Sequence, residues 1–149
     1  MAFWEKQKAI KALYEQFSRP VRIRHGISQM EFSILLFIDA NPDENTAADI
    51  VKTCRFTKSH VSVAIMNLEK KALLTRYFLK DNNKIIHLSL TDKAEAILDD
   101  ARSAGERYRS VLFDGFSEED LLRVRMYFEK LCQNAEKELE HREETEEDA

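Results

Sequence analysis

Few residues in this sequence break regular structure or cross-link it. The 149 residues include three glycines, two prolines and two cysteines. So little Gly and Pro favours long helices joined by short loops. Cys54 and Cys132 are too few for a disulfide framework, which favours a reducing compartment. No apolar run approaches the roughly 18 residues of a membrane-spanning helix. We therefore expect a mainly helical, cytoplasmic protein with no membrane partner.

The common signatures of catalysis are also absent from the sequence. It has no Gly-rich phosphate-binding loop and no nucleophile elbow. The four histidines lie far apart, and the cysteines lie far from them, so no metal-ligand spacing is present. Carboxylate pairs such as Glu118–Glu119 fit the first turn of a helix, where the dipole favours them. We expect no enzyme activity, no cofactor and no metal.

Charge is distributed unevenly along the chain. The formal net charge is −4, yet residues 45–90 contain eight Lys or Arg and only three Asp or Glu. Residues 114–149 contain five basic and 13 acidic residues. A basic middle segment is the electrostatic footprint of a module that binds nucleic acid. Residues 141–149 form either an acidic tail that stays away from DNA or, more simply, the solvated end of the last helix.

The stretch from Thr57 to Lys71 organises the rest of the chain. Apolar residues recur there at i, i+3, i+4 and i+7, which predicts a helix with one buried face: Val61, Ala64, Ile65 and Leu68. The opposite face has no central carboxylate, and its small, polar and apolar side chains suit close approach to bases and phosphates. Thr57 is placed to cap the helix start, where free N–H groups favour a phosphate. We expect this helix to lie in a DNA major groove; the alternative is an ordinary amphipathic helix.

Two helices are predicted before residue 45. Residues 3 to about 19 carry an apolar stripe, and Pro20 is expected to bend or end that helix. A capping box formed by Ser28 and Glu31 begins the second helix, which runs to about Ala40 and is apolar nearly all round. The second helix is therefore predicted to be buried in the core.

A short third helix is predicted from Thr46 to Cys54. A tight turn separates it from the helix that begins at Thr57. A short helix, a tight turn and a second helix with a polar outer face make a helix-turn-helix.

A β-hairpin is predicted after this motif. Bulky, roughly alternating residues at 73–79 and 85–90 flank the segment 80–84, which has the composition of a turn. Such a hairpin is a wing, and Lys80 and Lys84 at its tip are placed for contact with phosphate or the minor groove. The alternative is a bare hairpin that covers the core.

Two further helices complete the chain. One is predicted over residues 92–113 after a Thr91 cap, and Gly115 ends it. The last begins at a capping box formed by Ser117 and Asp120. These helices carry more apolar surface than one small module buries, so we expect a homodimer that uses them together with the first helix.

The order of these elements resembles the MarR family of winged-helix regulators. The matching residues are 48–51, 57–62, 68–71, Leu73, Thr75, Arg76, Leu90 and Thr91. The fold class expected is mainly α with a small β-hairpin wing: a winged helix-turn-helix flanked by N- and C-terminal dimerisation helices. The resemblance implies a single domain over residues 1–149, with the winged module at about 28–91 and dimerisation helices at 1–27 and 92–140.

The resemblance also implies a function. Such proteins are homodimers that bind pseudo-palindromic operators in double-stranded DNA, and many release DNA when a small, often phenolic, effector or an oxidant acts. We therefore expect a transcriptional regulator, more specifically a repressor. By resemblance, an effector pocket lies between the dimerisation helices and the winged module, where it is lined by Phe17, Arg24, His25 and Phe37. The two phenylalanines are equally explained as core residues.

The candidate DNA-binding residues lie on the outward face of the 57–71 helix and on the hairpin. They are Thr57, Lys58, Ser59, His60, Ser62, Val63, Met66, Asn67, Lys70, Arg76, Lys80, Asn82, Asn83 and Lys84. Val63 and Met66 can contact thymine methyl groups, and Asn67 can pair with adenine. We expect A/T-rich half-sites with centres about 10 bp apart.

Some positions depart from the family pattern. The usual glycines fall on Arg55, Ala72 and Ala94. The wing pattern of Asp followed by two Arg appears as Asp81-Asn82-Asn83-Lys84, and without a gap the Asp of the family falls on Asn82.

Two alternative functions remain open. Arg55 and Lys58 could lower the pKa of the Cys54 thiol and make the protein a redox sensor, although a small core residue is the simpler interpretation of Cys54. The protein could also be a winged-helix module for protein–protein interaction without DNA binding, which the basic middle segment disfavours.

Overall fold

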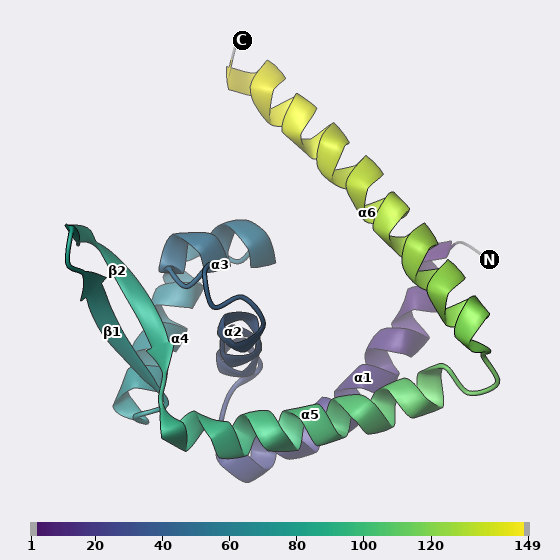
Figure 1. Ribbon diagram of the computed structural model, residues 1–149, viewed down its shortest axis with the longest axis horizontal. Coiled ribbons are helices and arrows are strands. Elements are labelled where there is room, and N and C mark those ends of the chain that lie inside the picture. The colour runs from purple at the N-terminus through teal and green to yellow at the C-terminus, as the bar shows by residue number, and fades with distance from the viewer. Residues whose placement is uncertain (1–2, 148–149) are drawn as a thin grey trace. The chain divides into compact units, whose positions relative to one another are not determined.

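The computed structural model describes residues 3–147. They form two compact units that divide between Arg109 and Ser110. The elements are α1 (Phe3–His25), α2 (Gln29–Ala40), α3 (Ala47–Cys54), α4 (Lys58–Lys70), β1 (Leu74–Leu79), β2 (Asn82–Leu90), α5 (Asp92–Leu112) and α6 (Glu118–Glu147) (Figure 1). The predicted fold class, mainly α with a hairpin wing, is confirmed. None of the helices in the described residues is long and apolar enough to cross a membrane.

One core joins the helices and the hairpin of the first unit. α2 packs against α4 and β2, and α3 packs against α4. The apolar face predicted for the 57–71 helix is buried, as is most of α2. The largest fully buried side chains are Ile34, Leu35, Ile50, Val61, Leu68, Leu74 and Leu98. These side chains belong to one hydrophobic core, whose burial stabilises the packing of the hairpin base against the helix-turn-helix.

Local hydrogen bonds set most helix starts as predicted. Ser28 and Glu31 form a complete capping box on α2, as do Thr46 and Asp49 on α3. At the start of α6, the Ser117 hydroxyl accepts from the N–H of Asp120, whose carboxylate accepts from the N–H of Ser117, each at 3.1 Å. These caps satisfy N–H groups that the first helical turn leaves without partners.

Two predicted caps differ in the structure. Thr57 occupies the N-cap position of α4, but its side chain makes no capping hydrogen bond. The hydroxyl of Thr91 instead donates to the carbonyl oxygen of Ala72 at 2.8 Å, and so joins the end of β2 to the chain just after α4. Sequence spacing identified both helix starts and could not show where the hydroxyl groups point.

The sequence predicted that Pro20 bends or ends the first helix. It does not end the helix, because α1 continues to His25. Proline removes one helical hydrogen bond, and burial of the apolar Val21 side chain next to it offsets part of that loss. The helix ends at Gly26, whose φ is 61°, and the N–H of Ile27 donates back to the carbonyl oxygen of Arg22 at 3.0 Å. A left-handed glycine after the last turn is a common helix ending.

The wing has a tighter turn than predicted. Leu79 pairs with Asn82, so the turn contains only Lys80 and Asp81, and both Asn82 and Asn83 belong to β2. The register then shifts: Tyr77 pairs with His87, and the strand from residue 83 to 86 bulges outward opposite Phe78. Such a bulge increases local twist and exposes side chains near the tip.

Two positions where the family pattern has glycine keep a glycine-like backbone. Arg55 has φ 53° and Ala72 has φ 56°, both in the left-handed region. Arg55 follows α3, and Ala72 lies between α4 and the wing. The third position, Ala94, is a fully buried residue inside α5. Left-handed backbone costs a residue with a Cβ roughly 1–2 kcal/mol, so this chain carries strain on both sides of α4: in the turn of the helix-turn-helix and before the wing.

In the second unit, α6 exposes large apolar side chains along much of its length. They include Leu122, Met126, Tyr127, Phe128 and Leu131, each more than half exposed. Of the two interpretations of residues 141–149, the end of the last helix agrees with the structure, because α6 continues to Glu147. Residues 148–149 lie outside the described residues. An apolar surface of this size on one helix is a common mark of a protein interface.

Candidate nucleic-acid interface

The outward face of α4 is exposed and carries little charge. Ser59, His60 and Ser62 are exposed, and so are Val63 (52%) and Met66 (43%). The other predicted residues on this helix, Lys58 and Lys70, are exposed as well, whereas Asn67 is half-buried. The structure therefore brings all these predicted side chains onto one face. That face can offer hydroxyl and amide hydrogen bonds beside apolar contact surface.

The start of α4 keeps backbone donors available. The hydroxyl of Thr57 lies 3.4 Å from that of Ser59 and does not cap the helix. The first N–H groups of a helix have no intrahelical partner and, with the helix dipole, attract an anion. An uncapped helix start beside Lys58 is thus suited to receive a DNA phosphate.

A hydrogen-bonded cluster fixes the base of the wing to the loop before α3. The Asn45 amide oxygen lies 2.6 Å from His87 Nδ1. The Asn45 amide nitrogen donates to the Tyr77 hydroxyl at 3.0 Å and to the Pro42 carbonyl oxygen at 2.9 Å. The Asn45 carbonyl oxygen also accepts from the N–H of Leu88 at 2.8 Å. Tyr77 and His87 stack on each other with centroids 5.4 Å apart. Because Asn45 is buried, these bonds orient the hairpin relative to the helix-turn-helix.

An ion pair joins the wing to the end of α4. Arg76 donates from Nε and Nη2 to the two carboxylate oxygens of Glu69, each at 2.7 Å. A two-pronged pair of this kind has a defined geometry. Arg76, predicted as a DNA-binding residue, is therefore held by Glu69, although its side chain stays 44% exposed.

A buried carboxylate anchors the chain just after α4. Glu31 is buried and accepts from Nζ of Lys71 at 2.7 Å, and the same ammonium donates to the carbonyl oxygen of Gly26 at 2.9 Å. Lys93 donates to the carbonyl oxygen of Lys71 at 2.8 Å. The sequence identified Glu31 only as a capping residue, because its partner lies 40 residues away.

The four residues predicted for an effector pocket do not gather in one place. Arg24 and His25 both contact Asp100, at 2.9 and 2.7 Å, and these hydrogen bonds lower the pKa of Asp100. Phe37 is a buried core residue. Phe17 alone lines a cavity of about 510 Å³ within the first unit.

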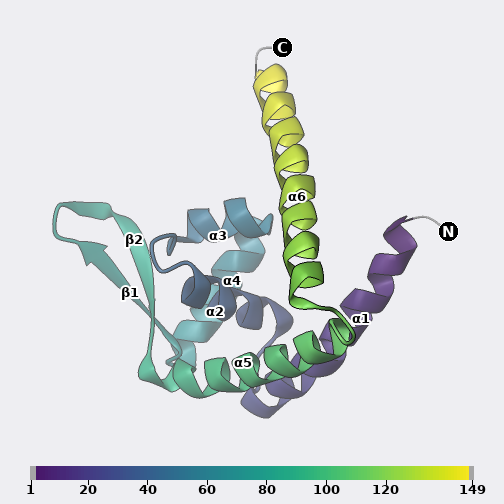
Figure 2. The same cartoon turned by 45° about the vertical axis from the view of Figure 1, so that its right-hand side comes forward.

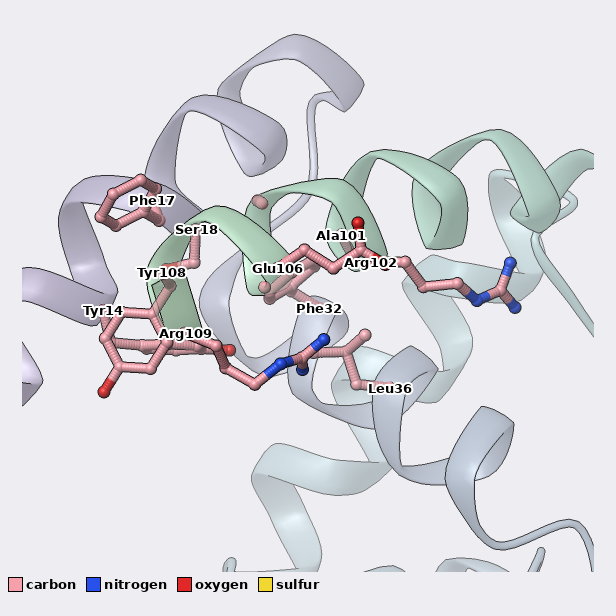
Figure 3. A pocket seen from close by; sticks show the side chains of 12 residues that line it. Tyr14, Phe17, Ser18, Phe32, Leu36, Ala101, Arg102, Glu106, Tyr108 and Arg109 are labelled. Atoms are coloured by element: carbon pink, nitrogen blue, oxygen red, sulfur yellow. The ribbon is translucent and has the colours of Figure 1, made fainter. Parts of the chain in front are cut away.

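That cavity has an aromatic wall. Tyr108 meets Tyr14 and Phe17 edge to face, with ring centroids 5.4 and 6.1 Å apart. Figure 3 shows these rings with Ser18, Phe32 and Leu36 around the same space. The hydroxyl of Ser18 is buried and has no hydrogen-bond partner among the described residues. Burial raises the pKa of Tyr14 above its ordinary value.

Cys54 does not have the environment of a reactive thiol. Burial raises the pKa of Cys54, which is opposite to the lowering expected from Arg55 and Lys58. A thiol reacts as the thiolate, so a raised pKa reduces its reactivity. Cys54 packs against the core, which supports the simpler interpretation.

Comparison with known proteins agrees with this geometry. The model of the MarR family matches residues 25–81, from the end of α1 to the turn of the wing. Over this segment the chain is similar to the MarR family. The resemblance noted from the sequence is thereby confirmed.

Solved MarR-type structures share the fold over most of the chain. A MarR family regulator from Listeria monocytogenes, complexed with a 26mer DNA, has a TM-score of 0.79 and 21% identity, and the match covers 90% of this chain and 89% of the other. S. aureus MepR in complex with DNA has a TM-score of 0.75 and 21% identity, covering 90% and 96%. The organohalide-sensing regulator RdhR, bound to 2,4-dichlorophenol, has a TM-score of 0.65 and 18% identity, covering 88% and 78%.

Proposed function

We propose that this chain is a transcriptional regulator that binds a pseudo-palindromic DNA operator as a homodimer and represses transcription. The observation that carries this proposal is the exposed face of α4, which has no carboxylate at its centre. The wing, fixed beside that face by Asn45 and the Glu69–Arg76 pair, supports it. Both lie in the segment that matches the MarR family.

In this proposal α4 is the recognition helix and lies in the major groove, where Val63, Met66 and Asn67 meet base edges. The exposed residues at the helix start contact phosphates. Lys80 and Lys84 bring positive charge toward the minor groove. The predicted 28–91 module thus contains the whole DNA-binding surface.

The dimer is proposed to form through the terminal helices, in the segments 1–27 and 92–140. Support comes from α6, whose exposed apolar side chains would otherwise remain in water. Two copies related by a two-fold axis would present two recognition helices to one side of the duplex.

The cavity lined by Tyr14, Phe17 and Tyr108 is proposed to bind a small aromatic or phenolic effector that releases DNA. Its rings offer edge and face contacts, and Ser18 offers an unused hydroxyl. RdhR, a relative with the same fold, is known bound to a chlorinated phenol.

Electrophoretic mobility shift tests the DNA-binding proposal. The full chain is titrated onto the promoter region beside its own gene and onto an unrelated duplex of equal length. We expect a shift of the promoter at concentrations at least tenfold lower. Equal affinity for both duplexes would contradict sequence-specific regulation.

Paired ligands test the effector proposal. We expect 2,4-dichlorophenol to bind and to weaken the DNA complex, and 2,4-dichloroanisole, which lacks the hydroxyl group, to bind less well. Ser18→Ala should remove the difference between the two ligands without harming the fold, because it deletes an unsatisfied buried hydroxyl. If calorimetric titration shows that Ser18→Ala still prefers the phenol over the anisole, the ligand hydroxyl does not contact Ser18.

A further inference from the structure

The wing carries an unusual concentration of exposed apolar side chains. Apart from Ile10 and Ile23 on α1, every exposed large apolar residue within residues 6–109 lies on α4 or on the hairpin. On the hairpin these residues are Tyr77, Phe78, Leu79, Ile85 and Ile86. The proposed DNA-binding surface is thus more apolar than the rest of the first unit.

These side chains do not cover the core. A hairpin that covers a core buries one face, because successive side chains on a strand point to opposite faces. Here Phe78 (52% exposed) and Leu79 (49%) are adjacent on β1 and both lie in solvent. Only the base of the hairpin is buried, at Leu74 and Leu88. The apolar residues near the tip therefore have no structural role in the first unit.

The hairpin holds its tip away from the helices that it adjoins. Figures 1 and 2 show β1 and β2 projecting beyond α3 and α4, with the turn at the free end. The two-residue turn keeps Leu79 directly beside Lys80. The Asn45 cluster and the Glu69–Arg76 pair fix the base. An apolar end on a fixed, projecting hairpin is suited to insertion.

The polar residues around the tip indicate what it enters. Lys80 and Lys84 flank the turn, Asn82 and Asn83 follow it, and Asp81 is the one acidic residue between 74 and 90. Proteins that bind the minor groove combine Lys, Arg or Asn with inserted Phe, Leu or Ile side chains. Protein interfaces, in contrast, are poor in Lys and Asp. Charge and composition both favour DNA as the occupant.

We propose that Phe78 and Leu79 form an apolar wedge that enters the minor groove beside the recognition helix and partly unstacks one base step in each half-site. This inference rests on the proposed function as a DNA-binding regulator. Unstacking bends the duplex, and bends of roughly 20–90° accompany such wedges. Pyrimidine–purine steps unstack most readily, so the wedge selects TA or CA steps at a position where no base edge is hydrogen-bonded.

The test uses a 30-bp duplex that the wild-type protein recovers from a random-sequence pool. The duplex carries fluorophores at its two ends to report bending, and 2-aminopurine replaces one adenine at a time to report unstacking. We expect bending and increased 2-aminopurine fluorescence at one step per half-site. Phe78→Ser with Leu79→Ser should abolish both signals and lower affinity about tenfold. Both residues are exposed, so the folded state is retained, which circular dichroism checks.

Two control variants separate the wedge from the lysines. Phe78→Leu with Leu79→Met keeps apolar side chains and should keep the fluorescence signal. Lys80→Ala should lower affinity and its salt dependence while the same base step stays unstacked.

Each further outcome is decisive. A wild-type complex without unstacking, or equal unstacking by the serine variant, overturns the wedge and leaves DNA binding intact. Failure of the wild type to recover any duplex overturns the proposed function together with the wedge. A third outcome is that the DNA stays straight while the wild-type protein forms assemblies larger than a dimer and the serine variant does not. That outcome would show that the apolar tip contacts a second copy of the chain.

Discussion

Two parts of this molecule expose large apolar side chains, and the charges around them differ in sign. On α4 and the wing, Val63, Met66 and Phe78 lie in a segment with eight basic and three acidic residues. On α6, side chains such as Phe128 and Leu131 lie in a segment with five basic and 13 acidic residues. Exposed apolar surface alone indicates a partner. The basic surround of the first surface favours a polyanion as its partner. The acidic surround of the second disfavours a polyanion, and we propose a second copy of the chain as the partner there.

The largest effect is expected on α6. Phe128→Asp with Leu131→Asp should weaken dimerisation roughly a thousandfold. Each substitution would replace an apolar side chain, buried in the proposed dimer and contributing about 2 kcal/mol, by a charge. Sedimentation should then show a folded monomer. Gln133→Asp adds charge on the same helix and should leave the dimer intact. If the wild-type protein is itself a monomer at micromolar concentration, the proposal that α6 forms a dimer interface is wrong.

A smaller effect is expected at the wing. Lys80→Ala with Lys84→Ala should weaken DNA binding roughly a hundredfold across all sequences, because four phosphate contacts per dimer are lost. The salt dependence of affinity should decrease by about one for each lost contact. Lys8→Ala with Lys11→Ala on α1 is the control with the same loss of charge. If both double variants bind equally, the wing lysines do not contact DNA.

The apolar side chains on the outward face of α4 should affect DNA affinity only at single base positions of the operator. Replacing operator thymines by uracil, one at a time, should weaken binding about tenfold at the position that Val63 or Met66 contacts. The matching Val63→Ala or Met66→Ala protein should no longer respond to that substitution. No response at any thymine would leave specificity to Asn67, the hydroxyl groups and DNA shape.

The smallest effect concerns stability and distinguishes the two left-handed positions that flank α4 from a helical position inside α5. Arg55→Gly and Ala72→Gly should each stabilise the fold by about 1 kcal/mol, because glycine adopts left-handed backbone without strain. Ala94→Gly, at a buried position inside α5, should destabilise it by about the same amount. Urea unfolding measures the stability of all three variants. Stabilisation by Ala94→Gly would contradict the assignment of Ala94 to a helical position without strain.

The sequence predicted those features that depend on neighbouring residues. Spacing of apolar residues identified the buried face of α4, and the pairs Ser28–Glu31 and Ser117–Asp120 are seen as predicted. Interactions between distant residues were missed, because no local pattern relates Lys71 to Glu31 or His87 to Asn45. The DNA-contacting residues remain predictions, since exposure places a side chain on a surface without naming what touches it.

The position of Pro20 shows the limit of residue preferences. Proline disfavours a helix interior, yet α1 continues past it because buried neighbours stabilise the helical path. The turn of the wing shows a similar limit. Asp81, Asn82 and Asn83 all favour turns, and strand pairing between Leu79 and Asn82 decided which of them form one.

The hydrogen bonds of the Asn45 side chain restrict which residues can replace asparagine at this loop position. Its oxygen faces His87, while its nitrogen donates to Tyr77 and Pro42. Aspartate has the same shape but would set a carboxylate oxygen against the carbonyl oxygen of Pro42, and alanine would leave three polar groups unsatisfied. We therefore expect lineages that keep this wing orientation to retain asparagine at the site, even where the exposed residues around it are free to change.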